Sequence, residues 1–161
     1  MSDFYSATCS VSFALLGLWW VVVQFKYDTW LRDPQRRRRA YLIALMFLLP
    51  GVMSLASLAS VRFSTLWQVG FGVAGLVGLV ESIRAVRLMP DADATAKVLG
   101  VLTAVLYLVV TVIALVPTLP ARLGLDLRGL EAEAIAVTGL LVLGASMVWR
   151  MFADPTDLPE A

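Results

Sequence analysis

Charged residues divide this chain into five long stretches that themselves carry no charge. The stretches lie between Asp3 and Lys26, Arg39 and Arg62, Arg62 and Glu81, Lys97 and Arg122, and Glu133 and Arg150. A bilayer core about 30 Å thick is crossed by roughly 17–25 apolar helical residues, so four stretches are long enough and the fifth is nearly so. Helices are favoured because each backbone N–H and C=O group in hydrocarbon must find a partner within its own segment.

The sequence therefore predicts an all-α integral membrane protein, a bundle of five transmembrane helices that forms a single domain over residues 1–161. The expected spans are approximately 4–25, 40–61, 63–83, 97–117 and 132–152. Only Arg62-Phe63-Ser64 separates the second span from the third. Such a short connection predicts an antiparallel helical hairpin. The longer connection from Pro117 to Leu130 leaves room for a short amphipathic turn.

Basic residues divide unevenly between the two sides of the predicted membrane. Ten lie on one side and three on the other: Lys26, Arg32, Arg36, Arg37, Arg38, Arg39, Arg84, Arg87, Lys97 and Arg150 against Arg62, Arg122 and Arg128. The positive-inside rule then predicts that the N-terminus lies outside and the C-terminus lies in the cytoplasm. We expect the protein in the plasma (inner) membrane.

Composition agrees with a membrane protein and excludes several other classes. Hydrophobic residues make up 60% of the chain and charged residues 16%. Soluble domains are less apolar, at about 45–50%, and more charged, at about 25%. A net charge of +1 gives no basic excess for nucleic acid, so the expected partner is the lipid bilayer.

The residue types needed for most catalytic and metal sites are missing from the sequence. The chain has no histidine and one cysteine. It therefore lacks Ser-His, Cys-His, CxxC and HExxH arrangements, and we expect no enzyme, cofactor or metal site.

Small residues recur every four positions along the third predicted span. They are Gly70, Ala74, Gly78 and Ser82. Together they form a ridge of the kind that lets helices approach closely in lipid. Residues 70–75 also satisfy GxGxxG literally, but a dinucleotide site needs a preceding strand, and here the pattern lies inside an apolar span. The ridge therefore predicts a helix-packing face, and weaker ridges of small residues on the first, second and fifth predicted spans favour a homo-oligomer.

Pro50 and Gly51 fall midway along the second predicted span. Proline removes one helical hydrogen bond, so a kink is expected there. Two interpretations remain open: a static kink that shapes packing, or a hinge or unwound segment that lines an aqueous cavity. Ser54 and Ser57 lie just beyond the proline and are expected to satisfy the carbonyls that it frees.

Hydroxyl groups recur every four residues on the fourth predicted span, at Thr103, Tyr107 and Thr111. One interpretation is hydrogen bonding between helices, which needs no pathway. The other is a narrow polar path in which hydroxyls replace part of the hydration shell of an ion or solute.

Glu81 is an acidic residue at the inner end of the third predicted span. A carboxylate there costs free energy unless it is paired, and Arg84 lies within pairing reach at i+3. The alternatives are an interfacial ion pair and a carboxylate that binds a cation or a proton at an inner vestibule. Glu131 and Glu133 begin the fifth span and are interpreted as N-terminal caps.

Four consecutive arginines, Arg36, Arg37, Arg38 and Arg39, precede the second span. They are expected to fix the topology, and they would also attract anionic lipid headgroups.

Two classes of function remain after these exclusions. The first is an oligomeric channel or carrier for ions or small polar solutes, and the second is a non-catalytic membrane subunit that packs against a larger membrane complex. The candidate pathway residues are Glu81, Ser54, Ser57, Thr103, Tyr107 and Thr111. They favour the first class because hydroxyls supply ligands without further buried charge.

Overall fold

Five long helices make up the bundle in the computed structural model, which describes residues 2–30, 33–60, 65–88, 94–125 and 128–152. The long helices are α1 (Ser2–Phe25), α3 (Pro34–Ala59), α4 (Leu66–Leu88), α5 (Ala94–Leu115) and α7 (Gly129–Phe152). Two single-turn helices join them, α2 (Tyr27–Trp30) and α6 (Leu119–Arg122), and all regular structure in the described residues is helical. Each long helix is long and apolar enough to cross a membrane, so the fold is all-α with five candidate membrane-spanning helices.

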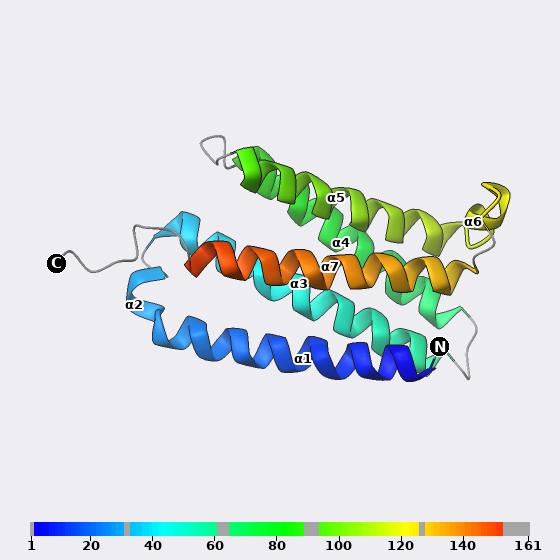
Figure 1. Cartoon of the computed structure of the whole chain (residues 1–161), viewed down its shortest axis with the longest axis horizontal. Helices are drawn as coiled ribbons and strands as arrows, with labels where there is room; N and C mark the ends of the chain where they lie inside the picture. Colours follow the sequence, from blue (N-terminus) through cyan, green and yellow to red (C-terminus); the bar gives the residue numbers. More distant parts are fainter. Residues whose placement is uncertain (1, 31–32, 61–64, 89–93, 126–127, 153–161) are drawn as a thin grey trace.

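Successive long helices run in opposite directions, so that α1 begins at one end of the bundle and α7 finishes at the other (Figure 1). Along the chain α1 packs on α3, α3 on α4 and α4 on α5, while α7 closes the bundle against α5 and α3. Helix α3 lies at the centre, because 56% of its apolar window is buried against 22–33% for the other four helices. This helix therefore contributes the largest share of the core.

The ends of several helices differ from the predicted spans for local reasons. Helix α3 begins at Pro34 rather than near residue 40, because the Asp33 side chain accepts the Gln35 N–H. Proline also suits the first turn of a helix. The four arginines therefore lie within the helix rather than before it. Helix α5 ends at Leu115. Pro117 follows two residues later, and proline disfavours helical geometry at the residue before it. The predicted turn at 62–64 lies outside the described residues.

Aromatic residues close the end of the bundle at which α3 begins. Trp30 of α2 is completely buried, with its ring centroid 5.8 Å from that of Trp19 and 5.9 Å from that of Phe152. The Trp19 Nε1–H donates to the Ala40 carbonyl over 3.0 Å, which joins α1 to α3. The short helix α2 therefore folds inward against the long helices.

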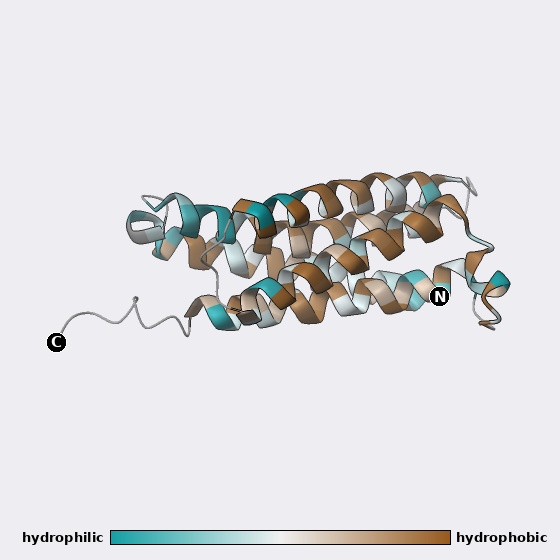
Figure 2. Ribbon diagram, turned by 90° about the horizontal axis from the view of Figure 1, so that it is seen from above, coloured by the Kyte–Doolittle hydropathy of each residue, from teal (hydrophilic) through white to brown (hydrophobic). Residues whose placement is uncertain are grey.

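Hydrophobic residues occupy the middle of the bundle along every long helix (Figure 2), and many of them are exposed on its outer surface. Outward residues such as Leu18, Val73, Ile135 and Val142 are each more than half exposed. A helix that is hydrophobic on all sides is typical of a protein surrounded by lipid. Hydrophilic positions gather mainly toward the end at which α3 and α5 begin, where the arginines of α3 lie.

Candidate functional site

A cavity of about 40 Å³ lies between α3, α4, α5 and α7, in the half of the bundle nearer the arginines. We call it the Tyr107 cavity. Its lining residues are Leu42, Leu45, Met46, Gly78, Glu81, Ser82, Ala85, Gly100, Thr103, Tyr107 and Met147. A volume of this size holds ordered water where polar partners are present. The structure thus brings together three predicted pathway residues, Glu81, Thr103 and Tyr107, together with two residues of the small-residue ridge.

Tyr107 is the polar group most fully enclosed at this cavity. Its side chain is 1% exposed, and its hydroxyl has no hydrogen-bond partner among the described residues. The ring lies against Gly78, where an added Cβ would overlap three ring atoms. Gly78 therefore makes room for the ring, and the buried hydroxyl retains both its donor and its acceptor capacity.

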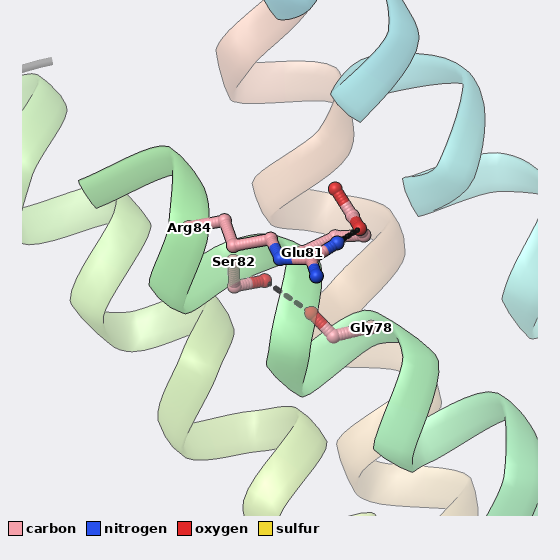
Figure 3. Close-up of polar contacts among 4 residues, drawn as sticks. All are labelled: Gly78, Glu81, Ser82 and Arg84. Atoms are coloured by element: carbon pink, nitrogen blue, oxygen red, sulfur yellow. Dashed lines mark hydrogen bonds and ion pairs between the residues drawn. The ribbon is translucent and has the colours of Figure 1, made fainter. Parts of the chain in front are cut away.

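Glu81 forms an ion pair at the wall of the same cavity. Its Oε1 lies 2.8 Å from Nη1 of Arg84, one turn along α4 (Figure 3). The Glu81 side chain is 21% exposed and that of Arg84 is 62% exposed, so the carboxylate is the more enclosed partner. The ion pair that the i+3 spacing allows is therefore present, and the paired carboxylate also borders the cavity.

In the hydroxyl row of α5, Thr103 and Thr111 donate within their own helix, so these two hydroxyls do not make the bonds between helices that one interpretation expected. Ser54 donates to the Pro50 carbonyl and Thr111 to the Tyr107 carbonyl, each over 2.8 Å. Thr103 bonds in the same way to Leu99. Such bonds to the carbonyl four residues earlier are a common arrangement of helical Ser and Thr. Of the predicted pathway residues, Ser54, Ser57 and Thr111 do not line the cavity.

Pro50 lies inside α3 and is fully buried. Because proline lacks an N–H, the carbonyl that loses its helical donor is that of Met46. The Ser54 hydroxyl bonds to the carbonyl of Pro50 itself, so Ser54 does not satisfy the carbonyl that the proline frees. A Cβ at Gly51 would come within 3.1 Å of the Phe13 ring, so Gly51 lets α1 approach α3 closely.

The small-residue ridge of α4 contacts two different helices. At Gly70 an added Cβ would collide with the Ala56 side chain of α3, whereas at Gly78 it would collide with Tyr107 of α5. Ala74 and Ser82 are both buried on the same ridge. The ridge therefore lies where α4 is enclosed by its neighbours within one chain.

Glu133 was predicted to cap α7, and that prediction is wrong. Glu131 does cap the helix, because its Oε2 accepts the Arg128 N–H over 2.9 Å. The Glu133 side chain is 0% exposed, and neither carboxyl oxygen has a hydrogen-bond partner among the described residues. Residues two apart on a helix point to roughly opposite sides, so one glutamate faces outward and the other faces the core.

The burial of Glu133 could have been predicted from the spacing of buried residues along α7. Glu133 shares a face with the buried Ala136, Leu140 and Gly144, which follow it at spacings of three, seven and eleven residues. Small and apolar residues at helical spacing mark a packed face, so the carboxyl in line with them belongs to the core. Its place near the helix start had suggested capping instead.

Tyr5 brings α1 to the beginning of α7. Its hydroxyl donates to the Leu130 carbonyl over 2.7 Å, and it interacts electrostatically with Glu133. The Tyr5 ring makes edge contacts with the rings of Phe4 and Phe71. A phenol hydroxyl and a carboxyl therefore lie together at the end of the bundle opposite the arginines.

The structure also limits the chemistry that is available. Within the described residues, no group of three or more His, Cys, Asp or Glu side chains is placed to hold a metal ion. No protein-family model, curated protein or solved structure matches the chain. What the fold and the buried polar groups define is a bundle of five candidate membrane-spanning helices with polar side chains enclosed at two levels.

Proposed function

We propose that this protein is a channel or carrier that passes a cation or a small polar solute across a membrane. The observation that carries the proposal is the unpartnered hydroxyl of Tyr107, a residue that lines a cavity together with Thr103 and Glu81. Oxygen atoms from phenol, hydroxyl and carboxylate groups can replace part of the hydration shell of a cation. Hydroxyl ligands add no further buried charge, which keeps the free-energy cost of such a site low.

Glu81 and Arg84 act together at the mouth of this pathway. Arg84 is largely exposed, so water can take over its bonds when the ion pair opens. An opened pair leaves a carboxylate that attracts cations toward the cavity, and added salt screens that attraction. Ser54, Ser57 and Thr111 remain candidates for lining only in a conformation that exposes their hydroxyl oxygens.

The test measures ion flux from liposomes that contain the purified full chain. Glu81→Gln should lower cation flux because it removes the carboxylate charge. Tyr107→Phe should lower it because it removes the unpartnered hydroxyl of a residue that lines the cavity. Tyr41→Phe is the matched control, since Tyr41 is exposed and does not line the cavity. Arg84→Gln frees the carboxylate and should raise cation flux at low salt.

Two results would contradict transport through this site. Wild-type vesicles that leak no faster than empty ones, for common ions and small solutes under either voltage polarity, exclude a pore or carrier. Equal effects of Tyr107→Phe and Tyr41→Phe would exclude the Tyr107 cavity as the pathway.

The second proposed function is a non-catalytic subunit of a larger membrane complex. The specific observation in its favour is the Glu81–Arg84 pair, which neutralises the carboxylate in the resting structure. Purification in mild detergent separates the two functions. A self-contained transporter is expected as a homo-oligomer, whereas a subunit is expected to bring different chains with it.

The proposed orientation places the N-terminus outside and the C-terminus in the cytoplasm, in the plasma (inner) membrane. Support comes from Arg36 to Arg39, Arg84 and Lys97, which lie toward the same end of the bundle. A reporter fused after Ala161 should be active only in the cytoplasm. Activity on the outer side would reverse the orientation or remove one crossing.

A further inference from the structure

The Glu133 carboxyl is enclosed on all sides in the half of the bundle remote from the arginines of α3. Its side chain is 0% exposed, and both oxygens lack hydrogen-bond partners among the described residues. An ionised carboxylate in an apolar interior is costly unless a cation or several donors accompany it. Whether the Glu133 carboxyl is neutral or ionised therefore depends on the groups that surround it.

Those surroundings contain one other ionisable group among the described residues, the Tyr5 hydroxyl of α1. The neighbouring segments 50–59 of α3, 66–80 of α4 and 108–115 of α5 contain no Asp, Glu, Lys or Arg. Near this end of the bundle, Asp3, Arg122 and Arg128 are exposed, and Glu131 is engaged with the Arg128 N–H. No charged side chain of the described neighbours thus accompanies the carboxyl in the core.

The chemistry of the site selects a proton over a metal ion. A hard cation needs about six or more oxygen ligands, whereas the side chains placed here supply one carboxyl and one phenol. The phenol proton is already donated to the Leu130 carbonyl over 2.7 Å. A proton needs only the carboxyl itself, and binding it removes the buried charge.

We propose that Glu133 and the Tyr5 hydroxyl form a proton-binding site between α7 and α1. With the proton bound, the carboxyl is neutral and Tyr5 donates to Leu130, which is the arrangement observed. When the carboxyl O–H bond breaks, the proton passes to water at the nearer end of the bundle and the carboxylate keeps the electron pair. Tyr5 is then the donor at hand, and its O–H turns from the Leu130 carbonyl to the carboxylate.

The Tyr5 hydroxyl can change its acceptor from the Leu130 carbonyl to the Glu133 carboxylate with little movement, because Leu130 and Glu133 are three residues apart and share one face of α7. Reorientation of a single hydroxyl therefore converts one state into the other. The consequence is that the contact between the first and last long helices depends on proton occupancy. This inference does not rest on the proposed transport, because occupancy is measured without any flux.

Infrared spectra of the full chain in lipid vesicles test the site directly, with isotope-labelled glutamate to separate glutamate from aspartate carboxyls. At neutral pH the wild type should show the band of a protonated glutamate carboxyl. Glu133→Gln should abolish this band, and the control Glu131→Gln should leave it unchanged. Tyr5→Phe should require a higher pH to remove the band, because the donor that stabilises the ionised form is lost.

A second variant keeps the test decisive if Glu133→Gln does not fold. The chain has four glutamates, so replacing Glu81, Glu131 and Glu160 with Gln leaves Glu133 as the only one. This triple variant should retain the band at neutral pH. A wild type and a triple variant that both lack the band would show that Glu133 is ionised, which overturns the proposal. Loss of the band at the same pH in Tyr5→Phe and wild type would exclude Tyr5 from the site.

Discussion

Replacing Gly78 with alanine tests whether the approach of α4 to α5 depends on the missing side chain. An added Cβ would overlap three ring atoms of Tyr107, whose side chain is 1% exposed and has little room to move. Overpacking of this kind costs about 1–3 kcal/mol. Alanine also gains about 1 kcal/mol over glycine in a helix, so the net loss of stability for Gly78→Ala is about 0–2 kcal/mol.

A matched control on the same helix removes the ambiguity in that net value. At Gly72 an added Cβ would meet only the Ala114 Cβ, at an ordinary 3.9 Å. The helix-propensity gain is the same at both positions, so Gly78→Ala should be less stable than Gly72→Ala by about 1–3 kcal/mol. Gly78→Leu should be worse still and should alter the oligomeric state or the compactness of the bundle.

The assay is reversible unfolding of the purified chain in mild detergent, followed by tryptophan fluorescence. A Tyr107→Leu background should shrink the difference between the two glycine variants, because the flat ring is gone. The reasoning is refuted if Gly78→Ala and Gly72→Ala unfold within about 0.5 kcal/mol of each other.

Two further predictions concern the end of the bundle at which α3 begins. Trp19→Phe removes the donor to the buried Ala40 carbonyl. Trp19→Phe should lower the free energy of unfolding by about 1–3 kcal/mol. The control Trp149→Phe, at an exposed position, should change it by less than about 0.5 kcal/mol. Equal effects of the two substitutions would contradict the role of the hydrogen bond. Arg37→Gln with Arg38→Gln should reduce the anionic lipid retained after purification, at about 1 kcal/mol of lipid binding per arginine. Mass spectrometry of the bound lipid measures this, and unchanged retention would contradict it.

The five long helices could be predicted from the sequence because long uncharged apolar stretches are a strong signal of helices that can span a membrane. The residues at which each helix begins and ends were harder to predict, because they depend on individual capping side chains and prolines. Asp33 and Pro34 begin α3 earlier than the hydrophobic pattern indicates, and the four arginines then extend a helix that hydropathy alone would begin at Ala40. Orientation and membrane location remain predictions.

The candidate site could be predicted only in part, because it depends on how each helix is rotated. The spacing of Thr103 and Tyr107 identified one face of α5, and Glu81 borders the same cavity from α4. The choice between a bond within a helix and one between helices required coordinates, as Thr111 shows. Glu133 was missed because two glutamates near a helix start resemble a capping pair, and only the register with Leu140 separates them.

The bond from Tyr5 to Leu130 has a consequence for the order in which the chain is made. It joins residues 125 positions apart, near the two limits of the described helices. Synthesis proceeds from the N-terminus, so Tyr5 is made before Leu130. Three long helices, α3, α4 and α5, are synthesised before the acceptor of the Tyr5 hydroxyl exists. Until then its hydroxyl needs a temporary partner, whether water, lipid headgroup or an insertion factor. A nascent chain arrested before α7 should therefore have α1 packed on α3 while the Tyr5 hydroxyl still lacks its Leu130 acceptor, and synthesis of the last helix completes that contact.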